Sequence, residues 1–246
     1  ELAELERKFP EFLTTDSPTQ RVGGKPLDKF VKVRHKIKQW SFDDVFSEEE
    51  IREFDARLKR MLKKELAVEG EIDYTCELKI DGFKIVLEYE KGALKTAATR
   101  GDGVIGEDVT QNVKTIESVP LKLEKEANII VEGEIWMSKR EFERLNAEQK
   151  KKGGQIFANP RNVGAGSIRQ LDPKIAASRK LDSFIYDLSL FSGNPPKTQF
   201  EELKILEELG FKVNKYYKHC KNINEVISFW KEWEKKKDSL QYGIDG

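Results

Sequence analysis

The sequence has little cysteine and no long apolar run. Cys76 and Cys220 are its only cysteines, and they lack the C-x-x-C spacing that marks zinc sites. We therefore assign no metal-binding residues and no disulfide framework, and we expect a reducing, cytoplasmic setting. No segment approaches the roughly 20 apolar residues of a membrane span, and the N-terminus shows no signal-peptide pattern, so we expect no membrane partner.

An excess of charge of one sign is also missing, because 44 basic and 44 acidic side chains cancel. Charged residues nevertheless make up 36% of the chain, against about 25% in an average protein. This balance excludes any argument from net charge for or against a nucleic-acid partner. At 246 residues the chain is long enough for one elaborated domain with a sizeable core, and we expect a monomer.

Capping patterns predict where the helices begin. Residues 1–13 have a helical pattern that already includes Glu1, so we interpret the chain as a fragment of a longer protein. Capping boxes, in which a glutamate follows a serine or threonine by three residues, start at Ser47, Ser138 and Thr198. With Asn159-Pro160, a further N-cap pair, they predict helices over residues 47–66, 138–152, 159–171 and 198–209, and another helix starts at Ile223.

Strand patterns cover residues 76–80, 83–90, 93–99, 128–137, 181–190 and 211–220. The second and third of these are joined by Lys91-Gly92, which predicts a hairpin. Helices and strands alternate irregularly, with hairpins in place of repeated strand-helix-strand units. This arrangement favours an α+β fold with antiparallel sheets over a doubly wound one.

Residues 77–82 (ELKIDG) carry the most chemical information. Because alternate side chains of a strand share a face, we expect Glu77, Lys79 and Asp81 on one side and the intervening apolar residues in the core. One interpretation is a pocket floor with a lysine nucleophile between two acids, where Gly82 leaves space for a ligand. The spacing alone favours a solvated strand face with two ion pairs.

Two later segments change this balance toward a functional site. Arg100 begins an Arg-Gly-Asp-Gly turn at the end of a predicted strand, where glycines allow close backbone approach and an arginine can reach a phosphate. Glu134 lies in a predicted strand after Gly133, which we expect to leave room for a flat group beside the acid. Alone, these segments also fit a plain turn and an ordinary strand.

Together the segments resemble the NAD-dependent DNA ligase family. CELKIDG (76–82) is similar to its nucleophile motif, ATRGDGVIGEDVTQNVKTI (98–116) to its arginine loop and VEGEIWM (131–137) to its ribose-binding motif. FANPRNVGAGSIRQLDP (157–173) is more specific, because ATP-dependent ligases lack this signature. The resemblance follows the family's order over essentially the whole chain.

The resemblance implies a fold and a division of the chain. The expected fold is the α+β covalent nucleotidyltransferase fold, which is ATP-grasp-like, with antiparallel sheets and flanking helices. Residues 1–15 would be the tail of an N-terminal helical subdomain. Residues 16–66 would be a linker and the helix that leads into the core, and residues 67–246 the nucleotidyltransferase core without its last motifs.

The resemblance also implies which residues act. Lys79 and Asp81 would be catalytic, with AMP attached to Lys79. The cofactor would be bound by Ser41 and Phe42 at the pocket border, Glu77 at the adenine edge, Arg100 and Glu134 near the ribose, and Tyr186 stacked on the adenine. The family usually has Met-Leu-Ser-Leu where this chain has Gln39-Trp40-Ser41-Phe42, so the pocket wall is expected to differ. Tyr186 equally fits an ordinary core aromatic.

Two arginines are expected to contact phosphates of the nucleotide or of DNA. Arg161 and Arg169 stand eight residues apart, on one face of a predicted helix. The competing interpretation is a pair of arginines on a solvated surface.

The implied reaction is attack by the Lys79 amine on the α-phosphate of NAD, which releases nicotinamide mononucleotide. Free lysine has a pKa near 10.4, so the site must disfavour the ammonium form. Mg²⁺ is expected as a second cofactor, because a metal ion neutralises charge on phosphates. The full-length enzyme would then transfer AMP to a 5′-phosphate at a nick in duplex DNA, as in replication and repair.

Two other functions stay open at this point. An ATP-dependent ligase or an RNA-capping enzyme shares the Lys-x-Asp-Gly nucleophile, although FANPRN argues against both. A binding module that holds adenine nucleotides or DNA without turnover also fits, because Ile244-Asp245-Gly246 resembles only the opening of the next motif. For this chain we therefore expect slow or absent adenylation and similar affinities for AMP and NAD.

Overall fold

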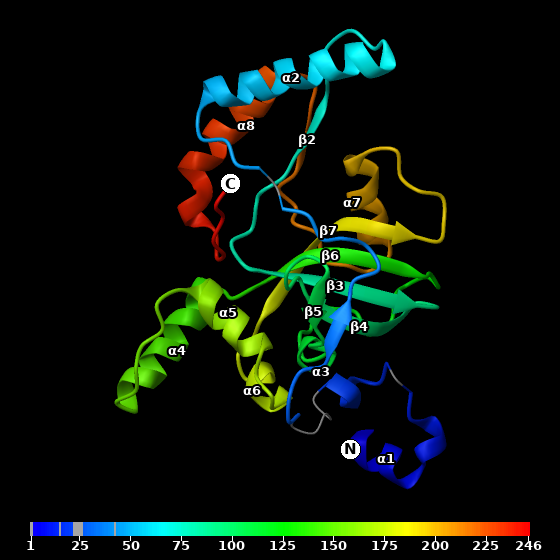
Figure 1. Ribbon diagram of the computed structural model, residues 1–246. Helices are drawn as coiled ribbons and strands as arrows, with labels where there is room; N and C mark the ends of the chain where they lie inside the picture. Colours follow the sequence, from blue (N-terminus) through cyan, green and yellow to red (C-terminus); the bar gives the residue numbers. More distant parts are fainter. Residues whose placement is uncertain (1, 15, 22–26, 42) are drawn as a thin grey trace.

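A four-stranded antiparallel sheet with the strand order β4-β3-β6-β7 forms the centre of the molecule (Figure 1). The computed structural model describes residues 2–14, 16–21, 27–41 and 43–246. The strands are β3 (Phe83–Glu90), β4 (Ala93–Thr99), β6 (Ile129–Trp136) and β7 (Asp182–Phe191). All four agree with the sequence prediction to within one residue at each end.

One face of this sheet carries the main core. Ile85, Leu87 and Tyr89 of β3 are at most 1% exposed, as the alternation of apolar residues requires. Helices α3 (Thr110–Val113), α5 (Pro160–Ile168), α6 (Pro173–Ala177) and α7 (Gln199–Glu208) surround the sheet (Figure 1). Buried residues of α3, α5 and α7 belong to the same core cluster as the strands. The sheet is therefore held rigidly beneath the residues described below.

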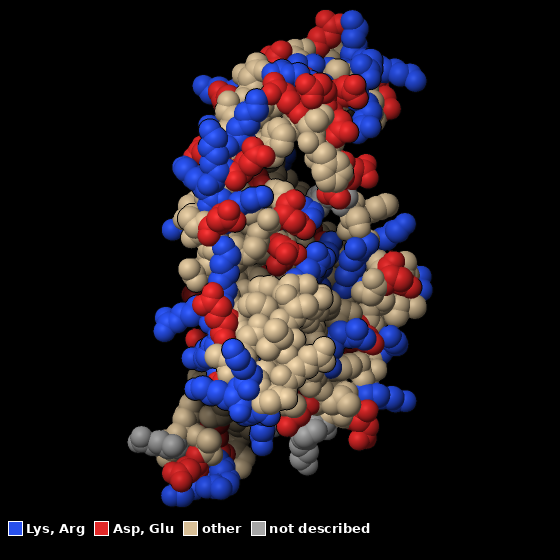
Figure 2. Space-filling model, turned by 90° about the vertical axis from the view of Figure 1, so that its left-hand side faces the viewer, with Lys and Arg blue, Asp and Glu red and all other residues tan. Residues whose placement is uncertain are grey.

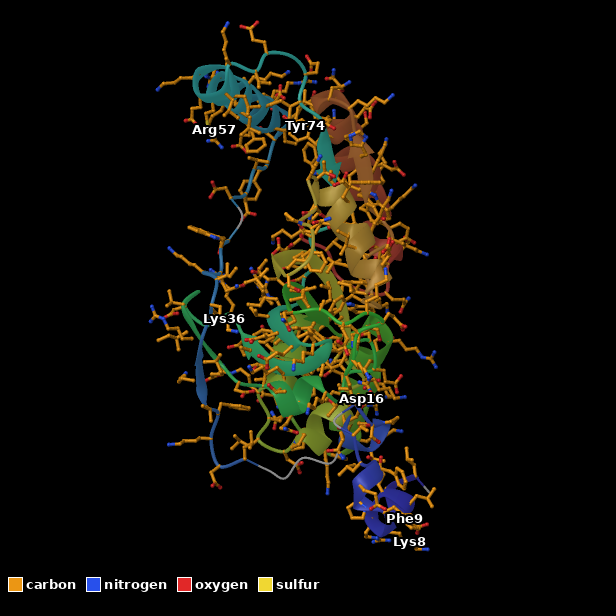
Figure 3. All side chains as sticks on the ribbon, turned by 90° about the vertical axis from the view of Figure 1, so that its right-hand side faces the viewer. Lys8, Phe9, Asp16, Lys36, Arg57 and Tyr74 are labelled. Carbon is orange, nitrogen blue, oxygen red and sulfur yellow. The ribbon has the colours of Figure 1, made fainter. Side chains whose placement is uncertain are left out.

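Two small antiparallel sheets extend this framework. β1 (Lys32–Arg34) pairs with β5 (Ile105–Glu107), and β2 (Tyr74–Cys76) pairs with β8 (Lys218–Cys220). The second sheet lies beside α2 (Glu48–Leu66) and α8 (Ile223–Lys236), where the Tyr74 hydroxyl donates to Asp55 Oδ1 at 2.6 Å. Figure 3 shows Tyr74 and Arg57 at this end of the molecule and Lys8 and Phe9 at the opposite end.

The predicted helix starts are confirmed by their capping bonds. Ser47 accepts a hydrogen bond from the Glu50 N–H, Ser138 caps α4 (Lys139–Lys151) in the same way, and Asn159 and Thr198 cap α5 and α7. These bonds satisfy N–H groups that have no partner within a helix. Helix α8 begins at Ile223, as predicted.

Four sequence predictions of element length were wrong. The strand predicted over 76–80 is β2 over Tyr74–Cys76, followed by one isolated bridge from Ile80 to Ile244. The strand predicted over 211–220 is only β8, because the preceding residues make a single backbone bond to β7, from the Ile185 N–H to the Lys212 carbonyl at 2.9 Å, and no ladder. Helix α5 ends at Ile168, with Arg169 as its C-cap. The helical pattern of residues 1–13 divides into α1 (Leu2–Lys8) and a 3-10 helix (Pro10–Phe12), because a proline interrupts the helical hydrogen bonds.

The mixture of helices and antiparallel sheets confirms the α+β class. In the part of the chain that the structure describes, no helix combines the length and the apolar character needed to cross a membrane. Figure 2 shows basic and acidic side chains interspersed over the upper part and the margins of the face that it presents, around a central area without charged side chains.

Candidate functional site

A cavity of about 510 Å³ opens beside β3 and β6 and gathers most of the residues predicted from sequence. The predicted residues that line it are Ser41, Glu77, Lys79, Arg100, Glu134, Arg161 and Tyr186. A second cavity of about 410 Å³ adjoins it, because Lys84, Arg100, Glu134 and Arg161 line both. Segments far apart in the sequence thus form one continuous cleft.

Three predicted residues are placed differently. Asp81 lines neither cavity, but its Oδ1 accepts a hydrogen bond from Arg161 Nη1 at 3.1 Å. Arg169 lines only the second cavity, where its Nε lies 2.9 Å from Glu107 Oε2. Phe42 lies outside the residues that the structure describes.

Lys79 lies on a short connecting segment that pairs with the C-terminal residues. Its N–H donates to the Gly246 carbonyl at 2.8 Å, and the Asp81 N–H donates to the Gly243 carbonyl at 2.9 Å. Lys79 Nζ donates to Asp245 Oδ1 at 2.8 Å. Asp245 was not predicted as a site residue, although the resemblance of residues 244–246 to the opening of a further motif was a usable signal.

Two glycines in the motifs allow close backbone approach. A Cβ on Gly82 would lie 2.4 Å from the Ile135 carbonyl oxygen and 2.7 Å from Glu134 Cγ, so the glycine admits Glu134 beside the lysine segment. A Cβ on Gly133 would lie 2.4 Å from the Phe184 carbonyl oxygen. The expectation that Gly133 makes room for a flat group was therefore wrong, because the space is taken by strand β7.

Tyr186 reaches the cavity through a β-bulge. Glu132 pairs with Asp187 and Gly133 pairs with Ile185, so Tyr186 is the extra residue on β7. A bulge redirects a side chain and increases the local twist of the strand. The Tyr186 hydroxyl donates to Glu134 Oε2 over a long 3.5 Å. Tyr186 is thus a cavity residue and not solely a core aromatic.

The turn that carries Arg100 is held by its own polar groups and by a histidine. Gly101 has φ +58°, and a Cβ there would lie 1.8 Å from the Ile105 carbonyl oxygen. His35 Nε2 lies 3.1 Å from the carbonyl oxygens of both Thr99 and Arg100. Since both partners accept hydrogen bonds, Nε2 must carry the proton. These contacts therefore hold the backbone at Arg100 in one position, from which its side chain reaches the cavity.

An extended segment forms the opposite wall of the cavity. Figure 3 shows Lys36 on this segment, which runs along the molecule before α2. Beyond it, the Gln39 N–H donates to the Gly103 carbonyl at 2.8 Å, and Lys84 Nζ donates to the Trp40 carbonyl at 3.3 Å. These bonds tie the wall to the arginine turn and to the sheet floor. Lys84 was not predicted as a site residue, and the signal for it was a lysine within a largely apolar strand.

Burial perturbs two carboxyl groups of the cavity. It raises the pKa of Glu134 to about 7, against the opposing attraction of Arg161, Lys84 and Lys79. It also raises the pKa of Glu77 to about 7, which a hydrogen bond from Gln199 opposes. Near neutral pH each group can therefore accept a hydrogen bond or donate one.

Glu202, a residue of α7 that lines neither cavity, gives a test of this electrostatic environment. Burial raises its pKa to about 7, and Asp187 and Glu132 add to the effect. The unfolded chain loses this proton first, near pH 4.3, so the free energy of unfolding falls as the pH rises from about 4.3 to 7. Glu202→Gln is expected to be more stable than the parent by about 1 kcal/mol at pH 8, after solvent screening, and no more stable at pH 4.

Urea denaturation of both proteins at the two pH values measures this difference. A gain of equal size at pH 4 and pH 8 would show that the pKa of Glu202 is the same in the folded and the unfolded state.

The cleft combines lysines, arginines and two half-buried acids around a volume that suits a nucleotide. A family model described as "NAD-dependent DNA ligase adenylation domain" matches residues 27–246, and one described as "DNA ligase-like, N-terminal NAD+-binding domain" matches residues 1–23. The chain therefore belongs to the NAD-dependent DNA ligase adenylation domain family.

Curated relatives agree with this assignment. Proteins named DNA ligase are 52% identical over 245 residues in Thermotoga petrophila, 52% over 249 residues in Thermosipho africanus and 48% over 246 residues in Thermoanaerobacter sp. strain X514. Each alignment covers 100% of this chain but only 35 to 36% of the relative. The chain thus spans about a third of the length of these relatives. The comparisons favour neither of the two alternatives left open by the sequence.

Proposed function

We propose that this chain is the adenylating part of an NAD-dependent DNA ligase, in which Lys79 accepts AMP from NAD for transfer to a 5′-phosphate at a DNA nick. The observation that carries the proposal is the position of Lys79. Its side chain lines a nucleotide-sized cavity together with Glu77, Arg100, Glu134 and Tyr186, the residues that the family resemblance assigns to adenosine.

Each residue would act through a contact that its position permits. Glu77 would accept a hydrogen bond from the 6-amino group of adenine, and the ring of Tyr186 would stack on the base. Glu134, which is held beside Lys84 on the neighbouring strand, would accept a ribose hydroxyl, and Arg100 would bind beside the ribose from its fixed turn. These contacts would orient the α-phosphate toward Lys79, and orientation is worth roughly 7 to 11 kcal/mol of a barrier.

The lysine must lose a proton before it can attack. Its ammonium donates to Asp245, whereas the Asp81 carboxylate is engaged by Arg161 at 3.1 Å. Attack therefore requires that Lys79 release the bond to Asp245. A phosphate that approaches Arg161 would compete with Asp81 and Asp245 for the guanidinium group. Asp81 would act at the phosphate end of the cleft, and Arg161 and Arg169 would bind phosphates of the nucleotide or of DNA.

The residues fit the two expected cofactors in different ways. For the adenosine part of NAD, the main cavity provides carboxylates that accept hydrogen bonds, an arginine and an aromatic ring. Among the residues that the structure describes, no group of three or more His, Cys, Asp or Glu side chains is arranged for a metal ion. Mg²⁺ commonly takes one or two carboxylates together with substrate phosphates, so Asp81 and Asp245 would hold it only when the nucleotide is present. The metal would neutralise charge on the phosphates.

We also propose that the fold is the ATP-grasp-like covalent nucleotidyltransferase fold, which the lysine segment beside the antiparallel sheet supports. Residues 1–15, 16–66 and 67–246 would be the helical tail, the linker with its helix, and the core. The cytoplasmic setting and the monomeric state stay predictions, and a sedimentation measurement would test the second.

Intact-mass measurement of the purified chain tests the proposed function. One sample is incubated with NAD and Mg²⁺ and a second with ATP and Mg²⁺. A mass gain of one AMP from NAD alone, even if it is slow or partial as the sequence leads us to expect, supports the proposal. A gain from ATP supports an ATP-dependent nucleotidyltransferase, and no gain from either supports a binding module without turnover.

A further inference from the structure

We infer that Gln199 is a positioning residue that makes the base pocket select adenine over a 6-oxo purine, by fixing the carboxylate of Glu77. The inference rests on the proposed function, because it concerns the recognition of the base in the same cavity. None of the motifs that define the family resemblance includes Gln199.

Gln199 joins the two residues that are proposed to contact the base. It is the first residue of α7, directly after the N-cap Thr198. Its Nε2 donates to Glu77 Oε1 at 2.9 Å and to the Tyr186 carbonyl oxygen at 2.8 Å. A carboxylate and a carbonyl only accept hydrogen bonds, so the NH₂ end of the amide must face them. A single side chain on α7 thus connects the lysine segment to strand β7.

The bond from Gln199 determines which oxygen of Glu77 is available. Oε1 is occupied by the amide, which leaves Oε2 as the oxygen free to meet a base in the cavity that Glu77 lines. An ionised carboxylate oxygen accepts a hydrogen bond from the 6-amino group of adenine. A protonated carboxyl instead offers a donor to the 6-oxo group of hypoxanthine or guanine. The protonation state of Glu77 therefore decides which base is preferred.

The surroundings of Glu77 oppose ionisation, and Gln199 favours it. Burial raises the pKa of Glu77 to about 7, and the acids Glu202 on α7 and Asp187 on β7 raise it further. Tyr217, whose own pKa is raised in part by Glu77, adds no positive charge. The N–H donated by Gln199 lowers the pKa of Glu77, because it stabilises the charged form. Without this amide, Glu77 would stay protonated to a higher pH.

The test compares AMP with IMP, which differ in the 6-amino and 6-oxo groups. Affinities are measured by calorimetry from pH 5.5 to 8.5 for the parent, Gln199→Met and Gln199→Leu. Methionine keeps the length of the side chain without a donor, and leucine is a second variant in case one does not fold. Gln149→Leu, on α4 and away from both cavities, is the matched control.

At pH 7 the affinity of the Gln199 variants for AMP is expected to fall about tenfold, and the affinity for IMP less than threefold. AMP binding by the parent weakens as the pH falls through the pKa of Glu77. Because loss of the amide raises that pKa, the same weakening should begin at a higher pH in the variants. The control should match the parent in both respects.

Equal loss of AMP and IMP affinity, with an unchanged pH profile, would overturn the inference and leave Gln199 a purely structural residue. This result is distinct from failure of the proposed function. If the parent gains AMP from NAD but the variants keep its AMP to IMP ratio, only the inference fails. If the parent neither binds AMP nor gains mass, the proposed function fails first.

Discussion

Lys79→Ala is expected to abolish the attachment of AMP from NAD and to leave the fold intact. The amine is the proposed nucleophile, and alanine removes it without replacement. Leu78 and Ile80, which anchor the segment in the core, are only 6% and 7% exposed and are unchanged. The pair with Asp245 is about half exposed, so its loss should change stability by less than about 1 kcal/mol. Intact mass and thermal denaturation measure the two quantities.

Two further variants sharpen this result. Lys79→Arg keeps a cation within reach of Asp245, but a guanidinium stays protonated and cannot attack, so no mass gain is expected. Lys95→Ala removes an exposed lysine of β4 that pairs with Glu90 and should be adenylated like the parent. Any AMP attached to Lys79→Ala would place the nucleophile elsewhere, with Lys84 as the next lysine in the cavity.

Glu134→Ala is expected to lower the affinity for AMP at pH 8 about 10-fold to 100-fold. A buried hydrogen bond that involves a charged group contributes roughly 1.5 to 3 kcal/mol, and 1.4 kcal/mol corresponds to tenfold. Glu134 is well placed for such a bond, because it lines both cavities on the rigid strand β6. Glu134→Gln keeps a neutral acceptor and should lose less affinity.

The pH dependence distinguishes this contact from a general disturbance of the cavity. Because the pKa of Glu134 is about 7, the parent loses its charged acceptor as the pH falls below 7. The difference in affinity between parent and Glu134→Ala should therefore shrink at pH 5.5. Calorimetry with AMP at both pH values measures it, with Glu90→Ala at the exposed end of β3 as the control. A difference that does not change with pH would remove the ionised carboxylate from the contact.

Local patterns predicted those elements whose determinants lie within a few residues. The hairpin of β3 and β4 agrees with its prediction at every boundary, because the Lys91-Gly92 turn and the alternation of apolar residues act locally. The N-caps at Ser47 and Ser138 agree for the same reason, since each bonds to an N–H three residues later. Where a boundary depended on a neighbouring strand, as for residues 211–220, the prediction was wrong.

The motif around Lys79 shows how far the local pattern reaches. Leu78 and Ile80 are buried as the alternation predicts, although the segment is not a strand of the sheet. The sequence also identified the acids and arginines that line the cleft. It did not identify Asp245, whose bond to Lys79 spans 166 positions, or Gln199, whose bond to Glu77 spans 122.

By itself, therefore, the sequence determined the family, the α+β class, the capped helices, the hairpin and the residue types of the cleft. The tertiary structure decided that a bulge directs Tyr186 into the cavity, that Gly133 makes room for β7, and that burial raises the pKa of the two cavity acids Glu77 and Glu134. The physical reason is the distance along the chain over which each interaction acts. Caps, turns and alternation act over a few bonds of the chain, whereas burial and pairing depend on which distant segments the fold brings into contact.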